Sequence, residues 1–250
     1  IRPHRSQNTQ RVIAPMIKVK NLSKRFGGVV ALSSVTFSIG ENEHCCVIGP
    51  NGAGKSTFFK CLTGQLQPSE GDISFKGQPI NGLQPHQIAR MGIGIKTQVP
   101  NVFDGLTAFE NVRLALQRVC SGADLQSRLE EIVSTMHLNE VIHQPVGKLA
   151  HGHRQLVELA MVVSQRPSLI LLDEPAAGMT KAESTRLAAL IKNLSSNHSV
   201  IVVEHDMQFI KLIGGRVTVF NRGEILADDD VGVVLNDRRV KDVYLGKQVA

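Results

Sequence analysis

Aromatic and disulfide-forming residues are scarce in this chain of 250 residues: tryptophan is absent, tyrosine occurs once and cysteine four times. The lack of large aromatic residues argues against an aromatic belt at a membrane and against a platform for stacked nucleic-acid bases. The cysteines form no C-x-x-C pair, so we expect reduced, mostly buried thiols rather than a zinc ribbon or a disulfide framework. No apolar run approaches the roughly 18 residues of a membrane-spanning helix.

Acidic residues are missing from the first 40 positions, which hold seven lysines and arginines. This segment accounts for the net charge of +6, because the rest of the chain is close to neutral. We expect residues 1–15 to form a basic, disordered extension. Such an arm can contact nucleic acid or anionic lipid, and that alternative stays open beside a solvated extension. The remaining composition, 42% hydrophobic and 20% charged, is that of an ordinary globular protein.

The hydrophobic pattern divides the body into three parts. Alternating or short apolar runs predict early strands at 16–20, 35–39, 44–48, 71–75 and 93–96. Strand signals almost disappear between 99 and 160, where helices are predicted at 107–116, 124–136 and 154–165. Strands then return at 169–172, 199–203 and 216–220, alternating with helices. This order predicts an α/β fold interrupted by a helical insertion.

A glycine-rich segment, Gly49-Pro-Asn-Gly-Ala-Gly54-Lys55-Ser56, matches the phosphate-binding pattern G-x-x-x-x-G-K-[ST]. It lies between a predicted strand and a predicted helix, which is the context that the motif requires. Glycines allow successive backbone N–H groups to face a phosphate, and the helix N-terminus adds a partial positive charge. We expect Lys55 to reach the β- and γ-phosphate oxygens and the Ser56 hydroxyl to bind Mg²⁺.

Two carboxylates follow a later apolar strand, in the segment Leu169-Ile-Leu-Leu-Asp173-Glu174. The end of that strand lies at the edge of the sheet where the phosphate loop is also expected. Asp173 is therefore a candidate Mg²⁺ ligand, directly or through water, and Glu174 a candidate to polarise a water molecule. Without the phosphate loop, the same pair is often a plain surface pair. His205 also follows a buried strand, where ligands of such sheets gather, and Gly152 leads into a helix with free N–H groups.

The order of these segments resembles that of the ABC transporter ATPases over residues 16–245. In that comparison, Leu149-Ala-His-Gly-His153 is similar to the family's Leu-Ser-Gly-Gly-Gln signature. The resemblance implies a P-loop NTPase (RecA-like) core with an N-terminal antiparallel β lobe and an inserted α-helical subdomain. The implied boundaries are 16–98 with 161–230 for the core and lobe, 99–160 for the helical signature subdomain and 231–250 for a C-terminal tail.

ATP and Mg²⁺ are the cofactors that this resemblance implies. Phe26 would stack on adenine, Gln98 would sense the γ-phosphate and couple to the membrane subunit, and His205 would contact the γ-phosphate. The implied catalytic residues are Glu174, His205, Lys55 and Gln98. The implied ATP-binding residues are Phe26, Asn51, Gly52, Gly54, Lys55, Ser56, Thr57, Ala150 and Gly152. The implied metal ligands are Ser56, Gln98 and Asp173.

Three segments are similar to the branched-chain amino acid and urea importer group within the family. They are Glu174-Pro-Ala-Ala-Gly178-Met-Thr180, Val203-Glu-His-Asp-Met207 and the tail at 239–246. Gly178-Met179-Thr180, with Asn197-His-Ser before His205, favours the urea type. The resemblance implies an ATPase that powers import of urea, short amides or branched-chain amino acids at the cytoplasmic face of a bacterial membrane. Its implied partners are a second ABC ATPase, two permeases and, indirectly, a solute-binding protein, with no nucleic acid.

The signature departs from the family pattern at three positions. Ala150 stands in place of the serine whose hydroxyl donates to a γ-phosphate, His151 replaces a glycine and His153 replaces the glutamine. Losing one such donor can cost about 10²–10³ in rate, by analogy with oxyanion donors. Because the signature of one chain completes the partner's site in this family, we predict a heterodimer with two unequal sites.

Three alternatives remain open at this point. A soluble ABC-type ATPase that acts on nucleic acid or ribosomes would use the basic arm, but this chain has one cassette and no long coiled coil. A kinase with the same phosphate loop would leave the signature, Gln98 and His205 unexplained. A metal site formed by His143, His151 and His153 is the third.

Overall fold

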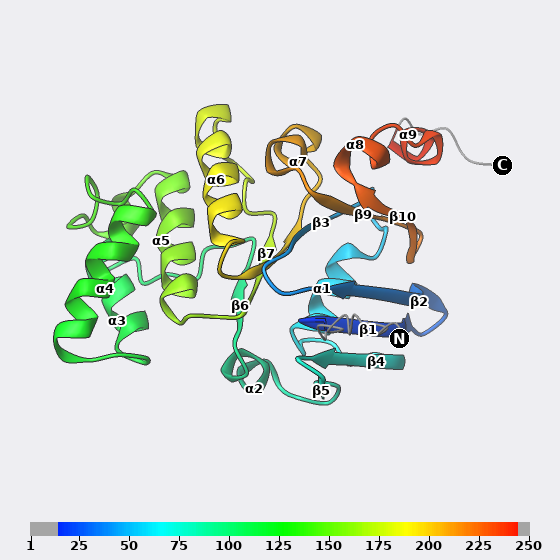
Figure 1. Ribbon diagram of the computed structural model, residues 1–250, viewed down its shortest axis with the longest axis horizontal. Coiled ribbons are helices and arrows are strands. Elements are labelled where there is room, and N and C mark those ends of the chain that lie inside the picture. The colour runs from blue at the N-terminus through cyan, green and yellow to red at the C-terminus, as the bar shows by residue number, and fades with distance from the viewer. Residues whose placement is uncertain (1–14, 245–250) are drawn as a thin grey trace, which may run out of the picture.

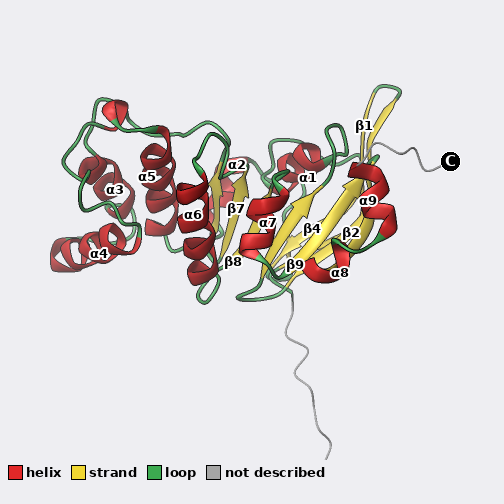
Figure 2. Cartoon of the chain, turned by 90° about the horizontal axis from the view of Figure 1, so that it is seen from above, coloured by secondary structure: helices red, strands yellow, loops and turns green. Residues whose placement is uncertain are grey.

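The computed structural model describes residues 15–244, which form two sheets flanked by helices (Figures 1 and 2). One sheet has four strands in the order β2-β1-β4-β5, and the other has six in the order β10-β9-β3-β8-β7-β6. The helices α3, α4 and α5 lie at one end of the molecule and the four-stranded sheet toward the other. Residues 1–14 of the extension predicted at 1–15 lie outside the described residues.

The four-stranded sheet is antiparallel, so the predicted β lobe is confirmed. It contains β1 (Ile17–Phe26), β2 (Val29–Ile39), β4 (Glu70–Phe75) and β5 (Gln78–Pro79). The strands predicted at 16–20 and 35–39 proved too short. Register shifts after Val19, Leu22 and Lys24 interrupt the pairing of β1 with β2. A bulge breaks the two-residue alternation, and that alternation is the only signal by which a sequence reveals such a strand.

The six-stranded sheet carries the parallel strands β3 (His44–Ile48), β6 (Ile93–Lys96), β7 (Leu169–Asp173), β8 (Ser199–Val203) and β9 (Arg216–Asn221). Alternate residues of β3 enter two different clusters: Cys46 and Ile48 face one, Cys45 and Val47 the other. Both faces of the sheet are therefore covered, as continuous apolar strands require. Cys45, Cys46 and Cys61 are buried and Cys120 is half-buried, and all four thiols are free.

The antiparallel edge strand β10 (Glu224–Asp230) was not predicted. Its second half is Asp228-Asp229-Asp230, and aspartate is depleted in strands. Tertiary contacts override that preference, because the Arg216 guanidinium donates to both carboxylate oxygens of Asp228 at 2.8 and 2.6 Å. The strand is joined to β9 by a tight turn at Arg222 and Gly223.

The helices of the α/β part are α1 (Lys55–Leu62), α2 (Pro85–Arg90), α6 (Lys181–Leu194) and α7 (Met207–Ile213). The helical part contains α3 (Ala108–Leu116), α4 (Gly122–Thr135), the short 3₁₀ turn Val146–Lys148 and α5 (His151–Ser164). Helix α5 begins three residues before the predicted start, because its first turn lies ahead of the apolar periodicity. Within residues 15–244, none of the helices has the length and apolar character needed to cross a bilayer.

The C-terminal tail contains two short helices, α8 (Val231–Val234) and α9 (Arg238–Tyr244). Val234 and Val240 are buried in the same apolar cluster as α6 and α7. The described part of the tail is therefore packed against the α/β part. Residues 245–250, which include the end of the tail segment at 239–246, lie outside the described residues.

Candidate nucleotide-binding site

The phosphate loop connects β3 to α1, as the sequence predicts. Two of its glycines cannot be replaced without moving backbone. A Cβ atom on Gly54 (φ 103°) would lie 2.6 Å from the Ala31 carbonyl oxygen, and one on Gly49 would collide with the Phe220 carbonyl. Real Cβ contacts are not this short, so the loop is shaped by glycine as the motif requires. The close approach also presses the loop against the start of β2.

Backbone hydrogen bonds join the phosphate loop to both sheets. The Gly223 N–H donates to the Ala53 carbonyl at 2.9 Å, and the Ser33 N–H donates to the Gly223 carbonyl at 2.9 Å. The sequence analysis did not single out Gly223, and the Asn-Arg-Gly segment at 221–223 was its only signal. The same β1–β2 hairpin carries Phe26, whose ring is 46% exposed, with the Lys24 ammonium 5.1 Å from its centre. The hairpin therefore presents an open aromatic face on an element that contacts the loop.

The Lys55 side chain folds back over the phosphate loop. Its Nζ donates to the carbonyls of Gly49 at 2.6 Å and Pro50 at 3.1 Å. Burial lowers the pKa of Lys55, while the nearby carboxylates of Glu174 and Asp173 act in the opposite direction. Asn51, Gly52 and Ser56 are exposed and Thr57 is half-buried. The polar groups of the loop are thus open to a ligand, and the buried Lys55 ammonium is held against two of the loop's carbonyls.

Two of the predicted site residues, Gln98 and His205, contact the carboxylate of a third, Glu174. The Gln98 amide donates to Glu174 Oε2 at 2.8 Å, and His205 Nδ1 lies 3.3 Å from Glu174 Oε1. These residues come from the loops after β6, β7 and β8, which are neighbours in the sheet. Glu174 adopts φ 45° and its N–H donates to the Val203 carbonyl at 2.9 Å. Such a backbone conformation is uncommon for a residue with a side chain and is often found at functional sites.

Asp173 lies at the end of β7, beside Glu174. Its pKa is raised by burial and by the adjacent Glu174 carboxylate, against the attraction of Lys96, Lys60 and Lys55. A bound cation would relieve this repulsion.

Glu204 is a buried carboxylate that the sequence analysis did not single out. It accepts hydrogen bonds from the backbone N–H groups of Ala176 and His205, both at 3.1 Å, and burial raises its pKa. It therefore ties the chain after Glu174 to the chain at His205. The only available signal was a charged residue at the end of an apolar strand.

The residues of the signature lie apart from this cluster. Ala150 is the N-cap of α5 and no side chain caps it, whereas the side chains of Thr107, Thr180 and Asp206 cap α3, α6 and α7. In Figure 1, α5 and α1 lie on opposite sides of β6 and β7, and Figure 2 shows them on opposite sides of β7. His151 Nε2 lies 3.1 Å from the Ala177 carbonyl, in the loop that follows Glu174. The structure therefore does not bring Ala150 and Gly152 to this chain's own phosphate loop.

Among residues 15–244 there is no group of three or more His, Cys, Asp or Glu side chains arranged to hold a metal ion. The structure gives no support to the alternative of a metal site at His143, His151 and His153.

A phosphate loop that faces carboxylates at the ends of neighbouring parallel strands defines a P-loop nucleotide hydrolase. Residues 32–177 match the family described as ABC transporter. This chain belongs to that family, and its class of activity is ATP hydrolysis coupled to transport.

Several relatives match over nearly their whole length. The chain is 36% identical to the "High-affinity branched-chain amino acid transport ATP-binding protein BraF" of Pseudomonas aeruginosa, over 93% of this chain and 98% of that protein. It is 34% identical to LivG of Escherichia coli, which has the same description, with the same coverage. An ABC transporter cassette solved in its ADP conformation superposes with a TM-score of 0.81 at 24% identity, covering 93% of this chain and 99% of that one. A dimeric bacterial ABC transporter cassette superposes with a TM-score of 0.77 at 28% identity, covering 86% and 99%.

Proposed function

We propose that this chain is the ATP-hydrolysing subunit of a membrane importer and that the cluster around Glu174 is its catalytic centre. The observation that carries the proposal is the position of the Glu174 carboxylate, held between Gln98 and His205 and within electrostatic reach of Lys55. A carboxylate fixed in this way beside a phosphate loop can orient one water molecule and accept its proton. Both actions lower the barrier to attack on a phosphoryl group.

The substrate in this proposal is ATP. The N–H groups of Asn51, Gly52 and Gly54 bind its phosphates, and the Phe26 ring stacks on adenine. Lys55 exchanges the carbonyls of Gly49 and Pro50 for phosphate oxygens. Glu174 orients the attacking water, while Gln98 and His205 hold Glu174 and reach the γ-phosphate. This arrangement works mainly by position and charge, which is how phosphoryl transfer is usually catalysed.

Mg²⁺ fits the residues that face the phosphate loop. Asp173 is a carboxylate whose pKa is raised by burial and by Glu174, and the exposed Ser56 hydroxyl and Gln98 amide are further oxygen donors. Oxygen ligands are those that Mg²⁺ prefers. When bound, the ion would neutralise charge on the β- and γ-phosphates.

A second ATPase completes each site in this proposal. The uncapped N-terminus of α5, with Ala150 and Gly152, supplies N–H groups to the nucleotide of the partner, because it lies away from this chain's own loop. A bacterial ABC transporter cassette of similar fold has been solved as a dimer. Since Ala150 carries no hydroxyl, we propose a heterodimer in which the site completed by this signature is the weaker one.

Replacing Ala150 with serine tests this inequality. We expect the isolated chain to hydrolyse ATP slowly and Ala150→Ser to raise its turnover by about 100-fold, because a phosphate donor is restored. The measurement is phosphate release against ATP concentration. The control is Ala182→Ser, which adds a hydroxyl to the exposed first turn of α6. Cooperative hydrolysis at full rate by the unaltered chain alone would rule out the heterodimer.

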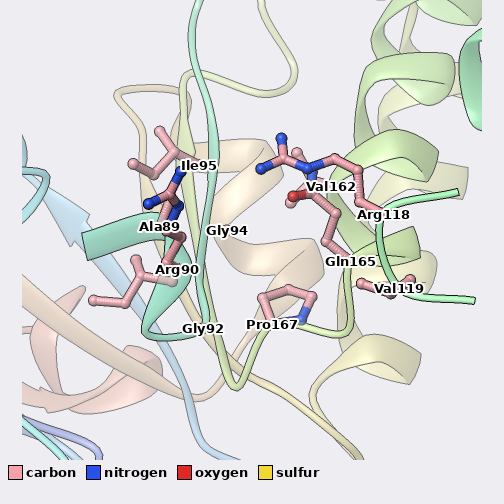
Figure 3. Close-up of a pocket in the computed structure, with 11 residues that line it drawn as sticks. Ala89, Arg90, Gly92, Gly94, Ile95, Arg118, Val119, Val162, Gln165 and Pro167 are labelled. Atoms are coloured by element: carbon pink, nitrogen blue, oxygen red, sulfur yellow. The ribbon is translucent and has the colours of Figure 1, made fainter. Parts of the chain in front are cut away.

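We place the membrane permease at a pocket of about 440 Å³ beside the edge strand β6 (Figure 3). Arg90 from the end of α2 and Arg118 from the segment after α3 line it, together with Ile95, which lies three residues before Gln98. The following segment exposes Val99 (76%) and Phe103 (57%). Apolar side chains beside two arginines suit an amphipathic permease helix with acidic residues. A permease bound at this pocket would contact residues only a few positions before Gln98 and could therefore shift the Gln98 segment.

We further propose that the imported solute is urea, a short amide or a branched-chain amino acid. The similarity to branched-chain amino acid transport proteins supports the last of these, and the Gly178-Met179-Thr180 segment favours the first. A solute-binding protein would select the solute outside a bacterial membrane, with this chain on the cytoplasmic face. The division at 16–98 with 161–230, 99–160 and 231–250 belongs to the same proposal.

An affinity purification from detergent-solubilised membranes tests the assignment. We expect the native chain to retain two permeases, a second ATPase and a solute-binding protein, whose identity would indicate the solute. The double variant Arg90→Glu/Arg118→Glu should lose the permeases and keep ATP binding. The control is Arg238→Glu, whose side chain is 94% exposed on α9. Recovery only in the soluble fraction, with ribosomal or nucleic-acid partners, would instead favour the soluble ATPase.

A further inference from the structure

A buried ion pair connects the segment that carries Gln98 to the helix that begins with the signature. Lys96 is the last residue of β6, and Glu158 lies two turns into α5. Lys96 Nζ lies 3.5 Å from Glu158 Oε2, and the two side chains are only 0% and 4% exposed. Lysine and glutamate are almost never buried this completely unless they are paired. The pair therefore needs an explanation beyond ordinary surface charge.

Glu158 contacts the chain on both sides of Gln98. Its Oε1 accepts a hydrogen bond from the Asn101 N–H at 3.0 Å, and its Oε2 faces Lys96. Lys96 Nζ also lies 3.4 Å from the Thr97 carbonyl. One carboxylate thus fixes the residues before and after Gln98. The Gln98 side chain remains exposed and reaches Glu174 Oε2 at 2.8 Å.

Stability alone does not account for the pair. Burial lowers the pKa of Lys96 and raises the pKa of Glu158, and each charge opposes the shift of the other. The neighbours of Glu158 in sequence, Val157 and Leu159, belong to the apolar cluster. Well-packed apolar residues often replace a buried ion pair without loss of stability. An apolar pair, however, could not form the hydrogen bonds by which Lys96 and Glu158 hold the backbone of residues 96–101.

We propose that Lys96 and Glu158 are positioning residues that fix the Gln98 segment to α5, so that the contact of Gln98 with Glu174 depends on the place of α5. The proposal rests on the function proposed above for Gln98 and Glu174. Helix α5 begins at the signature, which in this proposal contacts the nucleotide in the partner's site. The Lys96–Glu158 pair therefore connects the position of that signature to the geometry around the water molecule in this chain's own site. Neither residue touches substrate.

A double-mutant cycle between Glu158→Gln and Gln98→Ala tests the connection. Glu158→Gln keeps an acceptor for the Asn101 N–H and removes the charge that pairs with Lys96. We expect it to lower kcat by roughly 10- to 100-fold with little change in ATP affinity, as losses of outer-shell positioning do. The variant with both changes should be no slower than the slower single variant, because both act on one contact.

The cycle separates failure of this inference from failure of the proposed function. Full turnover by Gln98→Ala would overturn the role of Gln98, and this inference with it. If Gln98→Ala is slow and the two losses multiply, only the positioning role is overturned. A change of KM with kcat unaffected would also overturn it. Assays use the full chain with the subunits that co-purify, over a range of MgATP concentrations that extends to saturation.

A charge-neutral pair guards against a merely structural effect. Glu158→Gln alone leaves a buried unpaired ammonium, which lowers stability. Adding Lys96→Met should bring the Tm back toward that of the unaltered chain while kcat stays at least about tenfold low. Recovery of kcat together with the Tm would overturn the proposal. The control is Asp228→Asn on β10, which removes the charge that pairs with Arg216 on β9 in another half-buried ion pair. Any effect of this variant on kcat should be additive with that of Gln98→Ala.

Discussion

The Glu174→Gln variant should bind MgATP normally, accumulate as an ATP-bound dimer and lose turnover by about 100- to 10,000-fold. Glutamine keeps the shape of the side chain and can still accept the hydrogen bond from Gln98, which spans 2.8 Å in the native chain. It cannot accept a proton from water, and it removes the carboxylate oxygen that faces His205 at 3.3 Å. Binding is therefore retained while the chemical step fails.

Two measurements check this result. Phosphate release at saturating MgATP gives the turnover, and size-exclusion chromatography with and without ATP shows whether the dimer persists. The matched control is Glu131→Gln, which removes the same charge from an exposed position on α4, at the end of the molecule away from α1. Normal turnover by Glu174→Gln would show that another group activates the water.

The second large effect is expected at the phosphate loop. Lys55→Ala should weaken nucleotide binding by about 10- to 100-fold, since a hydrogen bond to a charged group contributes roughly 1.5–3 kcal/mol. The native ammonium is already largely removed from water, since Lys55 is only 8% exposed, and it is held at 2.6 Å from the Gly49 carbonyl. Little further desolvation is then needed when a phosphate replaces that carbonyl.

Equilibrium binding of a fluorescent ATP analogue measures this loss. Lys192→Ala, at an exposed position on α6, controls for removal of one positive charge. Thermal unfolding without nucleotide should show that Lys55→Ala remains folded. An unchanged affinity for ATP would count against the phosphate-binding role of Lys55, and it would leave the assignment of Glu174 to be judged by its own variant.

The Lys55 and Glu174 variants are expected to affect different steps of ATP hydrolysis. Loss at Lys55 concerns the ground state, because it appears as weaker binding. Loss at Glu174 concerns the transition state alone, because binding is kept. The positioning pair Lys96–Glu158 belongs with the second kind, since it is expected to lower kcat with little effect on affinity.

The sequence by itself determined the class of the protein and the chemistry of its parts. The phosphate loop needs glycines at set positions and a lysine directly after them, so local spacing was enough to find it. The strand that ends in Asp173 and Glu174 was visible because a strand buried on both faces is a continuous apolar run. The start of α6 is also set locally, because the side chains of Thr180 and Glu183 cap the helix within one turn.

Tertiary structure alone decided which distant residues meet. Gln98, Glu174 and His205 are separated by long stretches of chain, and only the order of β6, β7 and β8 in the sheet brings their side chains to one carboxylate. Glu158 and Lys96 look like surface charges on a helix and a strand until packing buries both. The strand β10 follows from the pairing of Asp228 with Arg216 against local preference. Patterns along a chain report local conformation and burial, whereas these contacts depend on the relative placement of whole elements.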